Sequence, residues 1–329
     1  MKAAVLKGPR NLTVTQVADP RIGSRDVLIK VEAASICGSD VHMYKEGLGG
    51  EIVIGHDFSG VVKEKGHEVS KFKRGERVTA EIVRYCGKCF YCSKGKYNLC
   101  LNARYMGFDV NGAFAEYVAA PAENIIKIPE KVSLEEAAVL EPVALALHTL
   151  SFINRKNNEW VAIIGQGSVG LVLTQVAKLY SFKVIGVDVE EEKLRLCRKF
   201  GADFTVDASK ENLEEKISSI TGGVGVDCAI EAAGSEKALI NAYEITRLDG
   251  TVLLVGWCES EMPRPPGEIV TIPVIDGPGK YKSAVKLLSQ GKINVENLIT
   301  HRITLDELPN FIRLMADGEV KPVKVIVNP

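Results

Sequence analysis

The feature that most constrains this chain is a change in its hydrophobic pattern near Trp160. From there, buried-strand patterns (WVAIIG, KVIGVD, FTVD, VDCAIEAAG and GTVLLVG) alternate with helical patterns such as SVGLVLTQVAKLY and EEEKLRLCRKFG. Strands that alternate with helices pair in parallel, because each helix carries the chain back along the sheet before the next strand begins. The pattern therefore predicts an α/β unit built on a doubly wound parallel sheet.

The residues on either side of this unit follow a different pattern. Residues 1 to about 150 contain short alternating runs (LTVTQV, DVLIKVEAA and RVTAEIV), separated by turn signals such as KFKRGER and DVNG. They predict an irregular β-rich domain. After about Gly279 the sequence predicts a helix (KYKSAVKLLSQG), a short strand (HRIT), a helix (DELPNFIRLMADG) and a last strand (PVKVIVN). A chain of 329 residues suits two domains.

The formal net charge of −1 argues against nucleic acid or a membrane surface as a partner. The first residues, MKAAVLKGPRNLTV, do not resemble a signal peptide, and no apolar run approaches the roughly 20 residues of a membrane helix. We therefore expect a cytoplasmic protein. In that reducing compartment, the eight cysteines point to metal binding or catalysis rather than to disulfides. Cys197, Cys228 and Cys258 lie in apolar segments and are predicted core residues.

A glycine-rich turn follows the first strand of the predicted sheet. Gly165, Gly167 and Gly170 form a GxGxxG pattern between a strand and a helix. These glycines permit a tight turn, a close approach of the backbone to a pyrophosphate, and close helix–strand packing. The phosphates would bind the N–H groups at the start of the helix. The pattern in this context predicts a dinucleotide site of the Rossmann type.

The residues after the second strand favour NAD over NADP. Asp188 ends VIGVD, and a carboxylate there accepts hydrogen bonds from the adenosine ribose and repels a 2′-phosphate. Val189 and Glu190 follow, and neither can bind that phosphate. We expect Lys193 to reach the adenosine end of the cofactor. The alternative is an acid that only begins a helix, followed by a solvated lysine.

Four clustered cysteines predict a structural zinc site. Cys86, Cys89, Cys92 and Cys100 have the spacing C-x2-C-x2-C-x7-C. Four thiolates complete the tetrahedral shell of zinc and leave no position for substrate. Thiols without metal and an iron–sulfur cluster are the alternatives.

A second set of residues predicts an open, catalytic zinc site. Cys37 lies in CGSDVH, His56 in GHDFSG and Glu141 in VLEPVALALH. One cysteine, one histidine and one or two carboxylates provide three protein ligands and leave a position for water or substrate. Taken singly, each residue is more often structural. Their combination with a dinucleotide-binding pattern favours the metal site.

Together these motifs resemble the zinc-dependent medium-chain dehydrogenase/reductase family. CGSDVH, GHDFSGVV, the four cysteines, GAFAEYV, LEP and GQGSVG occur in that family's order. The resemblance implies a GroES-like β-rich catalytic domain formed by residues 1–150 and 280–329, with a structural zinc lobe at 86–100. A Rossmann NAD-binding domain, residues 151–279, would be inserted into it. The motifs are most similar to the polyol branch: sorbitol (iditol), butanediol and galactitol-phosphate dehydrogenases.

The resemblance also assigns roles in the metal site. Cys37 and His56 match zinc ligands, and Asp57 occupies the position of the family's usual glutamate. Glu141 matches the glutamate that binds or polarises the zinc-bound water. The third protein ligand is therefore either Asp57, which is one methylene shorter than the family's residue, or Glu141.

Further matches concern proton transfer and the cofactor. Ser39 and His42 match the proton-relay positions of the family. The positions that match the NAD-lining residues, beyond the glycines, are Val169, Asp188, Lys193, Val255, Gly256 and Trp257. The segment 258–280 is shorter than in the family, which affects a region that borders the nicotinamide and the dimer interface.

The resemblance implies oxidation of a secondary alcohol, in a polyol, sugar alcohol or vicinal diol, with NAD as hydride acceptor and two zinc ions per chain. A homodimer or homotetramer is expected. One alternative is a zinc dehydrogenase of the same family that acts on L-threonine, glucose or a simple alcohol. An alternative of another class is a non-catalytic NAD-binding scaffold.

Overall fold

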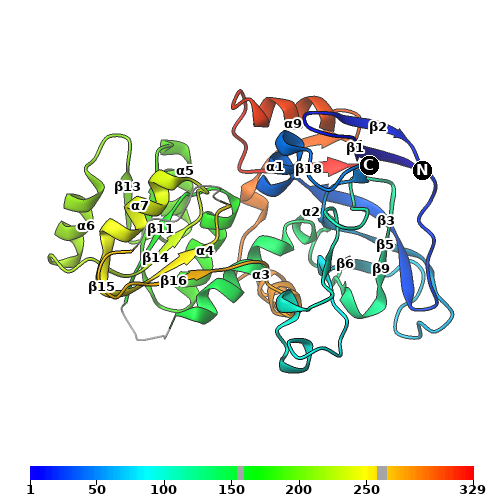
Figure 1. Ribbon diagram of the computed structural model, residues 1–329, viewed down its shortest axis with the longest axis horizontal. Coiled ribbons are helices and arrows are strands. Elements are labelled where there is room, and N and C mark those ends of the chain that lie inside the picture. The colour runs from blue at the N-terminus through cyan, green and yellow to red at the C-terminus, as the bar shows by residue number, and fades with distance from the viewer. Residues whose placement is uncertain (154–158, 258–264) are drawn as a thin grey trace. The chain divides into compact units, whose positions relative to one another are not determined.

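The computed structural model describes residues 1–153, 159–257 and 265–329, which form two compact units (Figure 1). One unit comprises Met1–Glu141 and Pro278–Pro329, and the other comprises Pro142–Gly277. Cys258 and the beginning of the shortened segment 258–280 lie outside the described residues.

The first unit is β-rich, as the sequence predicts, and holds two main sheets. A three-stranded sheet has the order β2-β1-β4, and a seven-stranded sheet has the order β10-β6-β5-β3-β18-β17, with β9 also paired to β3. Two further strands, β7 and β8, pair antiparallel in a small sheet of their own. The strands of the first unit are β1 (Lys2–Leu6), β2 (Leu12–Gln16), β3 (Asp26–Ser35), β4 (Ile52–Val53), β5 (Asp57–Lys65), β6 (Arg77–Ala80), β7 (Val83–Arg84), β8 (Arg104–Tyr105), β9 (Tyr117–Pro121), β10 (Ile125–Lys127), β17 (Ile299–Thr304) and β18 (Lys324–Asn328).

The centre of the seven-stranded sheet is built from segments far apart in the sequence. β3 pairs antiparallel with β5 on one side and with the C-terminal strand β18 on the other. Phe58 and Ile29 are among the side chains fully buried in the core of this unit. Its helices are α1 (Gly38–Glu46), α2 (Leu134–Ala137), α8 (Tyr281–Ser289) and α9 (Leu308–Ala316). Helix α3 (Leu140–Thr149) begins at the end of this unit's first segment.

The second unit is a six-stranded sheet of order β13-β12-β11-β14-β15-β16, with every neighbouring pair parallel. This confirms the predicted doubly wound parallel sheet. The strands are β11 (Trp160–Ile164), β12 (Lys183–Asp188), β13 (Phe204–Asp207), β14 (Val226–Glu231), β15 (Thr246–Leu254) and β16 (Val270–Pro273). The helices are α4 (Ser168–Leu179), α5 (Glu191–Lys199), α6 (Leu213–Thr221) and α7 (Glu236–Ile245).

The strand order of the second unit reverses between β11 and β14, and such a switch point is where open parallel sheets bind ligands. Apolar residues of the strands, such as Ala162, Ile185 and Val252, form its core with the helices. Cys197 and Cys228 are buried, as predicted for core residues. Among the described residues, the structure has no helix that is long and apolar enough to cross a membrane.

Candidate active site

Three residues of the predicted catalytic metal site come together in the first unit. The ligand atoms of Cys37, His56 and Asp57 all lie within 4.8 Å of one another. The pairing of strands explains this, because Ser35 at the end of β3 is opposite Asp57 at the start of β5. Cys37, two residues beyond Ser35, therefore lies beside the residues that precede β5.

Asp40 connects the backbone of Cys37 to the imidazole of His56. Cys37 precedes helix α1, and its N–H donates to Asp40 Oδ2 at 2.8 Å. The other oxygen, Asp40 Oδ1, lies 3.4 Å from His56 Nδ1. Asp40 is fully buried. A carboxylate on Nδ1 directs Nε2 of the ring toward a metal, so Asp40 is suited to orient His56. Asp40 is not among the site residues predicted from the sequence, although it lies within CGSDVH.

The charges around this cluster favour a bound cation. Burial alone would lower the pKa of His56, but the charges of Asp40 and Asp57 raise it well above its usual value. Burial alone would raise the pKa of the Cys37 thiol, but its hydrogen bond with His56 and the charge of His56 lower it. The buried carboxylates thus attract a positive charge, which a proton on the imidazole or a metal ion can provide.

Lys324 binds one oxygen of Asp57 and leaves the other to the cluster. Lys324 Nζ lies 2.9 Å from Asp57 Oδ2, and both side chains are at most 1% exposed. Asp57 Oδ1 is buried, lies 3.8 Å from His56 Nε2, and has no hydrogen-bond partner among the described residues. An unpartnered buried carboxylate oxygen is costly unless something binds it. Together with the Cys37 thiol and the His56 ring, it fits zinc, which accepts sulfur, nitrogen and oxygen ligands.

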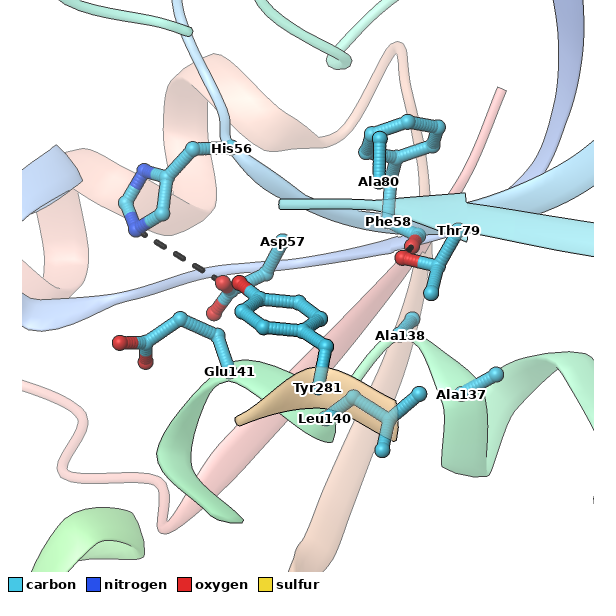
Figure 2. A pocket seen from close by; sticks show the side chains of 10 residues that line it. All are labelled: His56, Asp57, Phe58, Thr79, Ala80, Ala137, Ala138, Leu140, Glu141 and Tyr281. Carbon is cyan, nitrogen blue, oxygen red and sulfur yellow. Dashed lines mark hydrogen bonds and ion pairs between the residues drawn. The ribbon is translucent and has the colours of Figure 1, made fainter. Parts of the chain in front are cut away.

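A small pocket places Glu141 near this cluster (Figure 2). Its ten lining residues are His56, Asp57, Phe58, Thr79, Ala80, Ala137, Ala138, Leu140, Glu141 and Tyr281. Among the described residues, the group whose ligand atoms lie within 4.8 Å of one another is Cys37, His56 and Asp57. Glu141 lines the pocket outside this group. Tyr281, also absent from the predicted site residues, is buried and extends from α8 toward the side of the pocket that holds Asp57 and Glu141.

Two hydroxyl groups hold the segment that carries Glu141. Ser59 Oγ, on β5, donates to the carbonyl of Leu134 at 2.5 Å. Ser35 Oγ, on β3, donates to the carbonyl of Ala138 at 2.8 Å. Both donors lie on β3 and β5, the strands that also position Cys37, His56 and Asp57. The sheet therefore fixes the start of α3, and with it Glu141, relative to the cluster.

The two predicted proton-relay residues lie on helix α1. Ser39 and His42 are three residues apart, so they occupy the same side of the helix. Both are half-buried. They follow Cys37 closely in the chain, which keeps them near the group formed by Cys37, His56 and Asp57.

The four clustered cysteines also come together. Their sulfur atoms lie within 4.8 Å of one another, with Cys86 Sγ 4.0 Å from Cys92 Sγ and Cys89 Sγ 4.0 Å from Cys100 Sγ. Two ligands of a tetrahedral zinc ion are separated by about 3.8 Å when each Zn–S bond is about 2.3 Å. Hydrogen bonds from the N–H groups of Cys92 and Leu101 help to lower the pKa of Cys89 to about 6, whereas burial raises the pKa of Cys92 to about 12, so Cys89 is the thiol that ionises more readily of the two. The cluster thus has the spacing and a stabilised thiolate for zinc.

The glycine-rich turn of the second unit has the geometry of a phosphate site. Gly165 has a φ of +94°, and a Cβ there would lie 2.7 Å from the nitrogen of Ala233. A Cβ on Gly170 would lie 1.9 Å from the carbonyl oxygen of Gly165. At Gly167, which precedes α4, a Cβ would meet nothing within 4 Å. The first and third glycines are therefore needed for packing, and the second leaves space in front of the helix. Val169, in the first turn of α4, is half-buried.

Asp188 lies at the end of β12, beside this turn. Its Oδ2 accepts the N–H of Gln166 at 2.6 Å, and its Oδ1 accepts the N–H of Val189 at 2.7 Å. The carboxylate is thus held against the glycine-rich turn. Lys193 pairs with Glu190 at 3.0 Å, so this lysine is not simply solvated.

The last predicted cofactor-lining residues follow β15. The N–H groups of Val255 and Gly256 both donate to the carbonyl of Glu231 on β14, at 2.9 and 3.0 Å. Trp257 follows and is 56% exposed. The structure therefore places these residues at the carboxyl ends of β14 and β15, the edge of the sheet where such folds bind cofactors.

Comparisons with protein families identify both parts of the chain. Residues 23–130 match the alcohol dehydrogenase GroES-like domain, and residues 168–276 match the zinc-binding dehydrogenase domain. The GroES-like match agrees with the predicted β-rich catalytic domain, and the second match covers most of the parallel sheet.

Similar proteins are named for different substrates. The chain is 32% identical to a sorbitol dehydrogenase of Halalkalibacterium halodurans, over 100% of this chain and 99% of the relative. It is 35% identical to a D-arabitol-phosphate dehydrogenase of Enterococcus avium, over 97% and 93%. It is also 34% identical to an L-threonine 3-dehydrogenase of Bacillus subtilis, over 99% and 98%.

A solved structure with the same fold comes from a protein of Sinorhizobium meliloti 1021 and is bound to NADP. It has a TM-score of 0.93 and 33% sequence identity, and the match covers 100% of this chain and 99% of that one. The predicted fold class, a GroES-like domain with a Rossmann-type sheet, is thereby confirmed.

Proposed function

The chain belongs to the zinc-binding alcohol dehydrogenase family, in the medium-chain dehydrogenase/reductase group, and on that premise we propose that it oxidises a secondary alcohol of a polyol, sugar alcohol or vicinal diol with NAD. The observation that carries this proposal is the arrangement of Cys37, His56 and Asp57 around a buried carboxylate oxygen that has no hydrogen-bond partner in the part of the chain that the structure describes. Such a donor set suits a metal ion with one position left for substrate.

Cys37 Sγ, His56 and Asp57 Oδ1 are the proposed protein ligands of the catalytic zinc. When bound, zinc polarises the substrate hydroxyl and lowers its pKa, while the nicotinamide accepts the hydride. Lys324 holds the other oxygen of Asp57, which leaves Oδ1 as the oxygen for the metal. Four further cysteines (Cys86, Cys89, Cys92 and Cys100) are the proposed ligands of a structural zinc.

Glu141 is proposed to act on the substrate side of the site. Its place in the pocket lining, outside the compact three-residue cluster, supports a role in orienting the substrate or its neighbouring hydroxyl rather than a permanent place on the metal. A polyol presents a second hydroxyl next to the reacting one. A carboxylate that accepts a hydrogen bond from that hydroxyl would favour polyols and vicinal diols over simple alcohols.

Ser39 and His42 are proposed to carry away the hydroxyl proton. Ser39 accepts the proton of the substrate hydroxyl while it donates its own hydroxyl proton. His42 then delivers the donated proton toward solvent. Their spacing on α1 and their partial exposure support such a path, because a relay must begin near the metal cluster and end at water.

NAD rather than NADP is the proposed cofactor. Gly165, Gly167 and Gly170 would hold the pyrophosphate, and Asp188 would accept the hydroxyls of the adenosine ribose. The carboxylate of Asp188 beside the glycine-rich turn supports this preference, because it would repel a 2′-phosphate. Lys193, Val169, Val255, Gly256 and Trp257 complete the proposed cofactor site.

The relatives keep a second substrate class open. The threonine dehydrogenase is about as similar to this chain as the sorbitol dehydrogenase is, and L-threonine also carries a secondary hydroxyl. The polyol class is favoured because the sequence lacks the tryptophan-rich stretch that threonine dehydrogenases usually have after their CG-D-H motif. Its counterpart here reads VHMYKEGLGG.

We also propose a homodimer or homotetramer, which light scattering can determine.

The test is NADH formation by the zinc-loaded protein with a panel of alcohols: sorbitol, xylitol, 2,3-butanediol, sugar-alcohol phosphates, L-threonine, glucose and 2-propanol. Turnover confined to polyols or diols is expected. Turnover of L-threonine, glucose or 2-propanol in preference would contradict the substrate class. No turnover of any of them would favour a non-catalytic NAD-binding protein.

A further inference from the structure

Glu231 is a buried acidic residue at the switch point of the parallel sheet. It is the last residue of β14 and is 1% exposed. In register it lies beside Ile164 of β11 on one side and Leu254 of β15 on the other. It therefore ends a central strand, directly next to the strand that leads into the glycine-rich turn.

Glu231 holds the two loops that follow β14 and β15. Its side-chain Oε1 accepts the N–H groups of Ala233 and Gly234, at 2.8 and 2.7 Å. Its backbone carbonyl accepts the N–H groups of Val255 and Gly256. One residue thus fixes the backbone of residues 232–235 through its side chain, and that of residues 255–256 through its carbonyl.

The loops that follow β14 and β15 lie in close contact with each other. A Cβ on Gly256 would lie 2.3 Å from the nitrogen of Gly234 and 2.5 Å from Glu231 Oε2. On the other side, Ala233 lies against Gly165, where no side chain fits. The carboxylate of Glu231 therefore contacts the loops that follow β14 and β15, and the first of these loops contacts the glycine-rich turn.

The topology indicates which part of a dinucleotide these loops would meet. A dinucleotide crosses the switch point, with one nucleotide on each half of the sheet. Asp188, at the end of β12, belongs to the half that takes the adenosine ribose. The loops held by Glu231 belong to the other half, on β14 and β15, where the nicotinamide nucleotide would lie.

We propose that Glu231 is a positioning residue for the nicotinamide end of the cofactor: it holds the loops 232–235 and 255–257 in the conformation that accepts the nicotinamide ring. The proposal rests on the proposed use of NAD. It assigns no contact between Glu231 and the cofactor, because both its side-chain oxygens face the two loops. Removal of the carboxylate leaves the N–H groups of Ala233 and Gly234 without this acceptor, so the loop 232–235 loses the contacts that hold it.

The experiment compares two ligands that differ only in the nicotinamide ring. NADH binding is measured by fluorescence titration and ADP-ribose binding by calorimetry, for the wild-type protein and the variants Glu231→Ala and Glu231→Gln. Asp207→Asn is the matched control. Asp207 ends β13 beside Asp188 and accepts the N–H of Ser209 in the loop that follows it, so it belongs to the adenosine half of the sheet and any loss in this variant should affect both ligands alike.

We expect Glu231→Ala to weaken NADH binding by about tenfold or more, and to change ADP-ribose binding by less than about twofold. Glu231→Gln keeps one oxygen acceptor and should show a smaller loss, with the same selectivity for NADH. Equal weakening of both ligands, or unchanged NADH binding in both variants, would overturn the proposal. If Glu231→Ala does not fold, Glu231→Gln decides by the same criterion. A wild-type protein that binds ADP-ribose but not NADH would instead contradict the proposed cofactor.

Discussion

Lys324, in the last strand of the chain, holds Asp57 in place beside the proposed catalytic metal. Their charged atoms are 2.9 Å apart, and the two residues are separated by 267 positions in the sequence. The sheet explains the contact. β18 pairs with β3, with Ile326 opposite Ser35, and β3 pairs with β5, with Ser35 opposite Asp57. The C-terminal strand therefore contributes directly to the geometry of the site.

The first prediction concerns this buried ion pair. Lys324→Met leaves the Asp57 carboxylate buried beside Glu141 without its cation, and we expect the free energy of unfolding to fall by about 3–5 kcal/mol. The double variant Asp57→Asn with Lys324→Met removes both charges. Its loss of unfolding free energy should therefore be smaller than the sum of the losses in the two single variants. Urea unfolding of the four proteins measures this coupling. Strictly additive effects would show that the pair is not coupled.

The second prediction concerns the four-cysteine cluster. Cys86→Ser should remove one zinc ion per chain and lower the melting temperature by about 5 °C or more, because a structural metal contributes to folding. Zinc content by mass spectrometry and calorimetric melting measure the two effects. The matched control is Cys228→Ala, a buried cysteine outside both clusters, which should keep all its zinc. A Cys86→Ser protein with undiminished zinc would contradict the assignment.

The third prediction concerns the choice of cofactor. Asp188→Asn keeps the shape of the side chain but removes the charge, so we expect kcat/KM for NAD to fall about tenfold to a hundredfold. The ratio of NADP to NAD efficiency should rise in the same variant, because the repulsion of the 2′-phosphate is lost. Steady-state kinetics with both cofactors measures it. If the wild-type protein already prefers NADP, the assigned role of Asp188 is wrong.

The fourth prediction concerns proton transfer. Ser39→Ala should lower kcat by about a hundredfold, while the affinity for NADH stays within about twofold, since the hydroxyl acts on the proton and not on cofactor binding. A change in the solvent isotope effect on kcat is expected together with the loss. Ser289→Ala, on helix α8, is a control that should leave the kinetics unchanged. A Ser39→Ala enzyme with normal kcat would exclude this relay.

Much of the fold, and both groups of candidate metal ligands, could be predicted because the relevant signals are local. The parallel sheet follows from alternating strand and helix patterns, and four cysteines within sixteen residues cannot lie far apart. The pairing of Cys37 with His56 is less local, but their motifs flank strands that pair in the sheet.

The partners that refine the site could not be predicted in the same way. Lys324 resembles any charged residue at the start of a strand, and only the pairing of β18 with β3 brings it to Asp57. Tyr281 reads as the apolar start of a helix. Glu231 reads as the polar end of a strand, and its role depends on two loops that follow different strands. Asp40 did carry a signal, because an acid three residues after Cys37 can bind the N–H at the start of a helix.

The measurement that tests the central claim most directly combines zinc content with NADH formation, in the wild-type protein and in Cys37→Ala. The wild-type protein should contain two zinc ions per chain and reduce NAD with a polyol or diol. Cys37→Ala should contain one zinc ion, still bind NADH, and show no measurable turnover, because only the metal site that polarises the hydroxyl is lost. Full zinc content and wild-type turnover in Cys37→Ala would contradict the catalytic zinc site and the mechanism built on it.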